Sequence, residues 1–263
     1  MAVFQHILWG YGLSYPDHWA HRTLGALEGF AETAEAFDPD YSGPHSGQIL
    51  VRGEWNCLRQ PIEPIWNRHI GMLAGWVGAK KLGSAPWRMG GAVGLEAEIV
   101  LPQKDNRRLW TGILEHEFTV LHFVVLHIRE ERAEFEPQAT QIISSLRFLP
   151  NVSGVLVTDE GLPLPPGYIP ANPQDIVDSI TNPDQWLAYD GQSSAGALQA
   201  FYWREAPHYG WQITEYVPFP SPAELGFARF SMAKGNRTLT LGIMPYQDQD
   251  TKETLARLVF KMG

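Results

Sequence analysis

The sequence predicts an α+β fold of two domains, each a mainly antiparallel β-sheet covered by helices. Strand-like alternation followed by helical spacing occurs twice along the 263 residues, and a proline-rich stretch, Leu162-Pro163-Leu164-Pro165-Pro166-Gly167, opens the second round. Domains commonly hold about 100–150 residues, so the length fits two of them. We therefore place the first domain at residues 1–150 and a smaller one at residues 151–263.

The first domain is expected to begin with strands. Alternation of apolar and small residues predicts strands at 11–15 and 48–52. Pro61 fits the first turn of a helix, since proline is tolerated there. The apolar face of this helix has the spacing i, i+3, i+4, i+7 and i+11 and consists of Ile62, Ile65, Trp66, His69 and Leu73.

An antiparallel meander and a closing helix follow. Strands are expected at 94–101, 108–114 and 119–128, with a hairpin turn at Asp105-Asn106 between the first two. The last strand is apolar on both faces, so we expect it in the centre of the sheet with both faces covered. Pro137 is expected to open the closing helix, whose core face consists of Ala139, Ile142, Ile143 and Leu146.

Two helices are expected early in the second domain. Asn172 can cap a short one that starts at Pro173 and turns Ile176, Val177 and Ile180 to one face. Ser193 or Ser194 caps a longer one, in which Leu198, Phe201 and Tyr202 form the core stripe. Phe201 should therefore be core, and Trp203, about 200° further round the helix, should lie on the flank.

Strands and a final helix complete the second domain. Strands are expected at 211–217, 225–233 and 237–243, and Lys234-Gly235-Asn236 makes a hairpin turn between the last two. Asp250 and Glu253 resemble a capping box, which predicts a closing helix with Leu255, Leu258 and Val259 on its core face.

Some of these segments resemble known families. The opening Tyr15-Pro16-Asp17-His18-Trp19, the mid-chain helix, the meander and the ending Ile142-Ile143-Ser144-Ser145-Leu146-Arg147-Phe148 resemble the superfamily of photosystem PsbP, Ran-binding Mog and DcrB-like proteins. The resemblance covers about residues 5–148 and implies a protein-binding role rather than catalysis. The matching positions define the fold, so no functional residue is carried over. Residues 198–211, with Phe201-Tyr202 and Gly210-Trp211, resemble a small bacterial domain of unknown function.

Composition excludes several classes of function. The formal net charge is −9 and no basic stretch occurs, so nucleic acid is not expected as a partner. The N-terminus lacks the features of a signal peptide and no apolar run is long enough to span a bilayer, so we expect a soluble, cytoplasmic protein without membrane insertion. Cys57 is the only cysteine, which excludes intrachain disulfides and thiolate metal clusters.

No residue pattern specifies a cofactor, a metal or a reaction. His116, His122 and His127 are close in sequence, but His122 and His127 point to opposite faces of one strand, and His116 lies near the preceding turn. The glycine-rich stretch at 90–94 precedes a strand, whereas a dinucleotide-binding loop precedes a helix. Paired acids such as Glu115 and Glu117 are typical of solvated strand ends. We therefore expect no catalytic residues, no metal and no cofactor.

The ten tryptophans are the one excess in composition. Most are expected to fill cores, but four residues on helices with polar neighbours are candidates for contact with a partner or ligand: Trp66, His69, Trp203 and Arg204. We expect a non-enzymatic binding or scaffold protein whose partner is another protein. The alternative is a small-molecule-binding protein or an enzyme with a site in the interdomain cleft.

Overall fold

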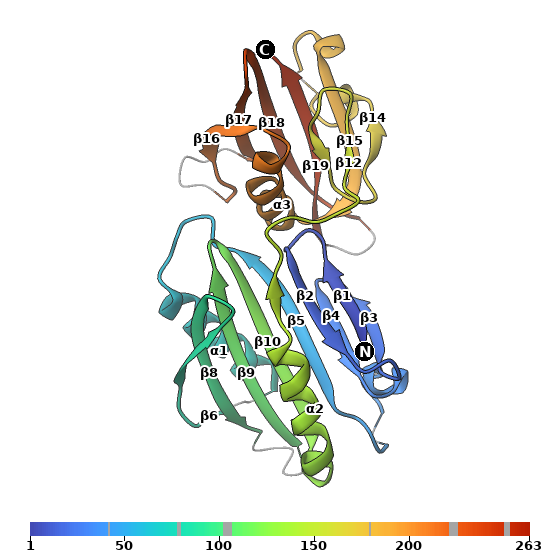
Figure 1. Cartoon of the computed structure of the whole chain (residues 1–263), viewed down its shortest axis with the longest axis vertical. Helices are drawn as coiled ribbons and strands as arrows, with labels where there is room; N and C mark the ends of the chain where they lie inside the picture. The colour runs from blue at the N-terminus through green and yellow to red at the C-terminus, as the bar shows by residue number, and fades with distance from the viewer. Residues whose placement is uncertain (42, 78–79, 102–106, 179, 221–225, 250–252) are drawn as a thin grey trace. The chain divides into compact units, whose positions relative to one another are not determined.

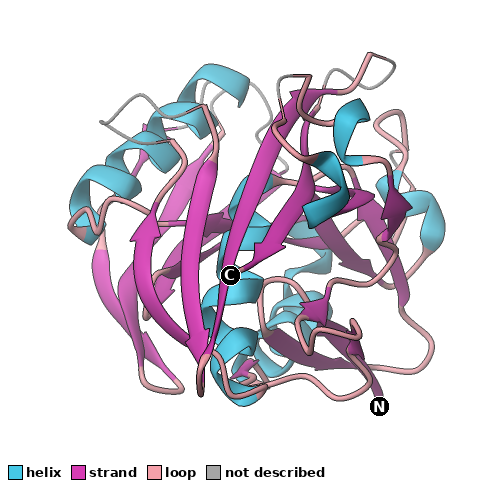
Figure 2. Cartoon of the chain, turned by 90° about the horizontal axis from the view of Figure 1, so that it is seen from above, coloured by secondary structure: helices cyan, strands magenta, loops and turns pink. Residues whose placement is uncertain are grey.

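Figure 1 shows the computed structural model, which describes residues 1–41, 43–77, 80–101, 107–178, 180–220, 226–249 and 253–263. The chain divides into two compact units: Met1–Gln5 with Tyr11–Phe148, and His6–Gly10 with Leu149–Gly263. The strands pair antiparallel in both units, and the predicted α+β fold is confirmed. Figure 2 shows how strands and helices are distributed over the chain. No helix in these ranges has the length and apolar character that crossing a membrane requires.

The first unit is built on an eight-stranded sheet. The strand order is β3-β4-β5-β10-β9-β8-β6, and β7 also pairs with β8. The strands are β3 (Ala20–Leu24), β4 (Leu27–Ala31), β5 (Gln48–Trp55), β6 (Lys80–Lys81), β7 (Ala85–Met89), β8 (Ala92–Val100), β9 (Arg107–His116) and β10 (Thr119–Ile128). A smaller sheet has the order β1-β2-β11 and comprises β1 (Ala2–His6), β2 (Tyr11–Tyr15) and β11 (Arg147–Phe148).

The strands predicted at 11–15, 48–52, 94–101, 108–114 and 119–128 are found as β2, β5, β8, β9 and β10, whereas β1, β3, β4, β6, β7 and β11 were not predicted. The turn predicted at Asp105-Asn106 lies outside the described residues. As predicted, β10 lies inside the sheet, between β5 and β9. Helix α1 (Ile62–Val77) covers one face and α2 (Arg132–Ser144) the other, behind and in front of the sheet in Figure 1. His122 contacts α1 and His127 contacts α2, so they point to opposite faces, as predicted.

The start of α2 corrects a sequence prediction. The helix begins at Arg132, after the short 3-10 helix η2 (Arg129–Glu131), and Pro137 lies inside it instead of opening it. Proline removes the hydrogen bond to the carbonyl four residues earlier, that of Ala133. Both residues are exposed, so water can satisfy that carbonyl and the cost to the helix is reduced.

The second unit contains a six-stranded sheet with the order β14-β15-β19-β18-β17-β16. Its strands are β14 (Ile169–Ala171), β15 (Trp186–Ser193), β16 (Gln212–Val217), β17 (Ala228–Lys234), β18 (Arg237–Gln247) and β19 (Thr254–Met262). Strands β12 (Leu156–Val157) and β13 (Pro163–Leu164) form a separate pair. Helix α3 (Ala195–His208) buries Leu198, Phe201 and Tyr202 completely, as the predicted stripe requires. The Ser194 Oγ accepts a hydrogen bond from the Ala197 amide at 3.2 Å and caps the helix.

Two predicted helices of the second unit are wrong. Residues 254–262 form strand β19, although Asp250–Lys252, the expected helix start, lie outside the described residues. Because β19 lies between β15 and β18, both of its faces are buried, and a short apolar run of this kind imitates helical spacing. The Asn172 side chain does accept from the Gln174 amide, at 3.1 Å, but it caps only a single 3-10 turn, Pro173–Asp175.

Candidate functional site

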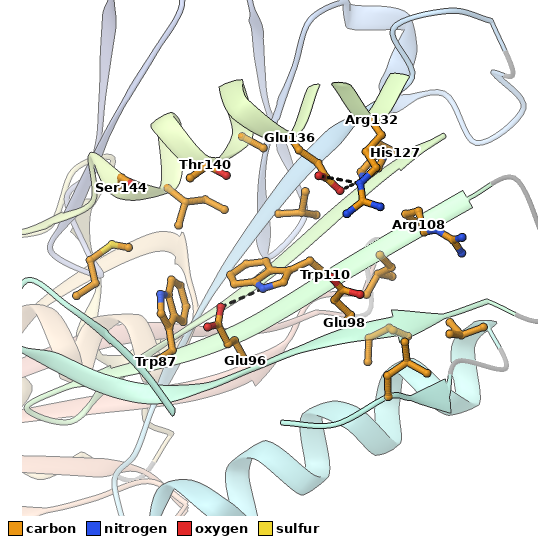
Figure 3. Close-up of a pocket in the computed structure, with 18 residues that line it drawn as sticks. Trp87, Glu96, Glu98, Arg108, Trp110, His127, Arg132, Glu136, Thr140 and Ser144 are labelled. Carbon is orange, nitrogen blue, oxygen red and sulfur yellow. Dashed lines mark hydrogen bonds and ion pairs between the residues drawn. The ribbon is translucent and has the colours of Figure 1, made fainter. Parts of the chain in front are cut away.

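A cavity of about 550 Å³ lies within the first unit, between α2 and strands β7 to β10 (Figure 3). We call it the α2 pocket. Alternation along the strands points one residue in two towards α2, and in this way four polar or aromatic residues enter the lining: Glu96 and Glu98 from β8, and Arg108 and Trp110 from β9. The floor of the pocket is therefore the sheet, and its roof is the helix.

Two indole rings form the aromatic wall of the pocket. The rings of Trp87 and Trp110 are nearly perpendicular, at 87°, with centroids 5.1 Å apart, and Trp87 also packs edge-to-face on Phe123. The Trp110 Nε1–H donates to the Glu96 carboxylate at 3.1 Å. Trp87 is only 8% exposed. Packing and one hydrogen bond therefore fix the wall.

Gly112 makes room for this wall. A Cβ atom at this position would lie 2.8 Å from the Trp87 ring and 2.9 Å from the Trp110 ring, closer than carbon atoms approach without displacement. Gly112 faces α2 in the middle of β9, so any larger residue would push Trp87 away from the sheet. This glycine is thus required for the shape of the pocket.

Charged groups gather at the other end of the pocket. Glu136 on α2 lies 3.2 Å from the His127 Nε2 and 3.0 Å from the Arg132 Nε. Arg108, the partner of His127 in the β9–β10 register, is close to them along the sheet. Within the described part of the chain, the side chains of Arg108 and Glu98 make no hydrogen bond or ion pair, although Glu98 interacts electrostatically with Arg132. These two side chains remain available to a ligand.

The opposite face of the sheet holds a closed polar network. We call it the histidine network: Glu54, His122, His69 and Thr111. The His122 Nε2 lies 3.1 Å from Glu54, and its Nδ1 lies 3.1 Å from the His69 Nδ1. The His69 Nε2 lies 2.6 Å from the Thr111 hydroxyl, which donates to the Phe123 carbonyl. All four polar groups are bonded within the protein.

The proton positions in this network follow from the donors available. Since Thr111 spends its only proton on the Phe123 carbonyl, the His69 Nε2–H must donate to Thr111. The His69 Nδ1 is then an acceptor and can take a proton only from the His122 Nδ1–H, so His122 donates to both His69 and Glu54 only as the doubly protonated imidazolium. Burial lowers the pKa of His69 to about 3, in agreement with a neutral ring.

Glu54 is ionised in the same network. Burial would raise its pKa, but the His122 hydrogen bond and the charges of Arg68 and Arg52 outweigh burial and lower the pKa to about 2. Arg68 is paired with Glu54, and an Arg52 nitrogen lies 3.5 Å from the same carboxylate. The network is thus a structural element with no cavity beside it among the described pockets.

Two of the four residues proposed from sequence belong to the interior of the first unit. Trp66 and His69 are 2% and 3% exposed and lie on the face of α1 that packs against the sheet. Direct contact with a partner would require α1 to move. The apolar spacing that suggested the helix also explains this burial, because both residues lie on its core face.

The other two residues lie on α3 in the second unit. Trp203 is half-buried at the flank, with its ring 5.4 Å from that of Tyr216. Arg204 pairs with the fully buried Glu205 at 2.7 Å and donates to the carbonyls of Ile7 and Leu8. Arg204 therefore holds the segment His6–Gly10 in the second unit. Two of the four candidates thus belong to the first unit and two to the second.

The residues that line the α2 pocket were not predicted as site residues from the sequence. The sequence did contain a signal for them, namely charged residues on one face of two neighbouring strands. Glu96 and Glu98 lie on the same face of β8, and Arg108 lies on β9. Charged residues are rarely buried without a partner, so such a pattern under a helix indicates a cavity or a polar network. Among the described residues, no group of three or more His, Cys, Asp or Glu side chains is placed to hold a metal.

No family model matches this chain, and no curated protein matches it. Three solved structures are similar in part or in whole. The match to cyanobacterial PsbP (CyanoP) from Synechocystis has 12% identity and a TM-score of 0.44, and covers 56% of this chain and 91% of that one. The Ran-binding protein Mog1p of Saccharomyces cerevisiae matches with 8% identity and a TM-score of 0.39, covering 56% and 95%. A Bacteroides thetaiotaomicron structure covers 96% and 88%, with 10% identity and a TM-score of 0.39.

PsbP and Mog proteins, which the sequence of residues 5–148 resembles, are thus among the structures similar to about half of this chain.

Proposed function

We propose that this chain is a binding protein and that its first unit holds a small organic molecule in the α2 pocket. The observation that supports this most is the cavity of about 550 Å³ with a fixed aromatic wall and charged groups at its rim. Ligand pockets commonly have volumes of roughly 300–1,000 Å³ and combine an apolar lining with a few well-placed polar groups.

The polar groups that line the pocket distinguish it from an empty cavity left by imperfect core packing. Engineered or accidental cavities in cores are lined by apolar side chains, whereas this one receives carboxylates from β8 and a guanidinium from β9. The side chains of Glu98 and Arg108 make no hydrogen bond to another described residue, so a ligand that binds them does not have to displace a protein group. Binding to these two groups therefore costs little protein rearrangement.

The proposal keeps the binding role that the sequence indicates but differs on the ligand. The sequence favours a protein partner and offers as alternative a small molecule in an interdomain cleft. The pocket supports a small molecule, and it lies inside the first unit rather than in a cleft between domains.

Titration with the neutral fluorescent dye prodan tests the proposal. Thr140 is exposed and lines the pocket, so Thr140→Trp should fill it, while Gln141→Trp on the next, non-lining position of α2 is the matched control. We expect one prodan molecule to bind the wild type and Gln141→Trp, and none to bind Thr140→Trp. Equal dye binding by all three proteins, or none by the wild type, would contradict the proposal.

A further inference from the structure

We infer that the α2 pocket selects an elongated zwitterion, with an ammonium group at the Trp110 end and an anionic group at Arg108. The inference rests on the proposed function and names the ligand class for the same site. It comes from the order of charged and aromatic residues along the pocket, which is set by strand register.

The ammonium end is defined by Trp110 and two carboxylates. Glu98 is the β8 partner of Trp110 in the register, and Glu96 accepts the Trp110 indole N–H at 3.1 Å. A cation over the face of an indole ring is attracted by the ring's quadrupole, and tryptophan is the strongest of the aromatic side chains in this respect. Trp87 stands at 87° to the first ring and closes a second side of the corner.

The two carboxyl groups make this corner selective for the charge of a ligand. Glu96 spends one oxygen on the indole N–H, and no arginine or lysine is paired with Glu96 or Glu98 among the described residues. An anion placed here would be repelled by both carboxylates. A neutral group would leave them without a counterion, so an ammonium group is favoured.

The anionic end is defined by Arg108. On the same face of β9, Arg108 lies two residues from Trp110, the partner of Glu98, and four residues from Gly112, the partner of Glu96, which is about 7 Å and about 13 Å at roughly 3.3 Å per residue. The nearby Arg132 is already paired with Glu136, at 3.0 Å, which leaves Arg108 as the available cation. A guanidinium binds a carboxylate through two parallel hydrogen bonds, so a carboxylate suits this end.

Three eight-carbon compounds separate the contributions of the ammonium group and the carboxylate to the affinity: octylamine, octanoate and 8-aminooctanoate. The last one places its charges about 10 Å apart when extended, since each C–C bond is about 1.5 Å long. Calorimetric titration of the full chain should give the order 8-aminooctanoate, octylamine, octanoate from tightest to weakest. We expect about tenfold between the first two, the low end of the range for a hydrogen bond to a charged group.

Substitutions at the two ends test the assignment. Arg108→Gln should abolish the advantage of 8-aminooctanoate over octylamine. Glu96→Gln retains an acceptor for the indole N–H but removes the charge, so it should weaken both amines. Glu134→Gln, on an exposed position of α2 outside the pocket lining, is the control and should change nothing.

Each outcome discriminates between the two proposals. If prodan binds but octanoate binds as tightly as the amines, or neither amine binds, the ligand class is wrong and the pocket stands. If prodan and all three compounds fail to bind, the proposed function itself fails. An unchanged amine affinity in Glu96→Gln would also contradict the ammonium assignment.

Discussion

On the α1 face of the first unit's sheet, polar side chains are bonded to one another, whereas on the α2 face they surround a cavity. His69 on α1 reaches His122 and Thr111 across the helix–sheet contact, and the network ends at Glu54. On the other face, Glu98 and Arg108 find no such partner within the described chain. One sheet therefore carries a closed polar network and an open polar pocket.

The size of the residues at each contact accounts for the difference. Facing α1, the sheet presents large side chains that fill the space, including Ile99, Leu109 and Ile113. Facing α2, the sheet has Gly112 in its middle, and the helix presents Ala139 and Ser144 to the same space. The small residues leave a volume that only the two indole rings partly occupy. Small residues on both walls therefore create the cavity.

Removing one polar side chain from the α1 face and one from the α2 face of the sheet should give the largest difference in the free energy of unfolding. We expect His122→Ala to lower the free energy of unfolding by about 3–5 kcal/mol, because it removes a buried ring and leaves the His69 Nδ1 without its donor. Arg132→Ala, which breaks an exposed pair with Glu136 and leaves Glu136 beside His127, should change this free energy far less. Hydrogen exchange of the β10 amides measures both within the first unit. Similar costs for the two variants would show that the faces do not differ.

Adding a methyl group on β9 and one on α1 should give the next largest difference in the free energy of unfolding. We expect Gly112→Ala to cost about 1–3 kcal/mol, since its Cβ would meet the Trp87 ring at 2.8 Å. Gly71→Ala is the matched control on α1, where a Cβ meets nothing within 4 Å, and it should stabilise the helix by about 0.5–1 kcal/mol. Urea titrations measure both changes. A Gly112→Ala protein as stable as the wild type would mean that Trp87 moves freely.

The sequence predicted the layers of the first unit well because its strands and helices have different periods. Residues 119–128 could be placed in the sheet centre, and His122 and His127 on opposite faces, from alternation alone. The pocket could not be predicted in this way. It depends on which residues oppose each other across strands, such as Glu98 and Trp110, and register is set by long-range pairing rather than by local spacing.

The same limit explains the errors in the second unit. Strand β19 was mistaken for a helix because the residues that bury it, on β15 and β18, are distant in sequence. Residues 186–193 were not predicted as a strand at all. Their alternation is weak, and Asp190 and Gly191 interrupt it. Tertiary pairing, not local preference, makes these two segments strands.

The third prediction for the two faces concerns acid, and its effect per pH unit is modest. A group whose folded pKa is lowered binds its proton later than in the unfolded chain, so acid favours unfolding. For His69 the window runs from its ordinary value of 6.5 down to about 3, and for Glu54 from 4.5 down to about 2. Stability contributed by the histidine network should be complete above pH 6.5 and should fall as the pH is lowered through these windows.

Each proton taken up only by the unfolded chain costs about 1.4 kcal/mol per pH unit. His69→Gln cannot take up that proton, so its free energy of unfolding should fall less steeply than that of the wild type between pH 6 and pH 4, roughly by one proton's slope. Asn67→Gln, at an exposed and non-titrating position of the same helix, is the control and should leave the slope unchanged. Urea titrations at several pH values measure the slopes. If His69→Gln and the wild type lose stability in parallel, the buried ring is not neutral, and the donor order derived for the histidine network is wrong.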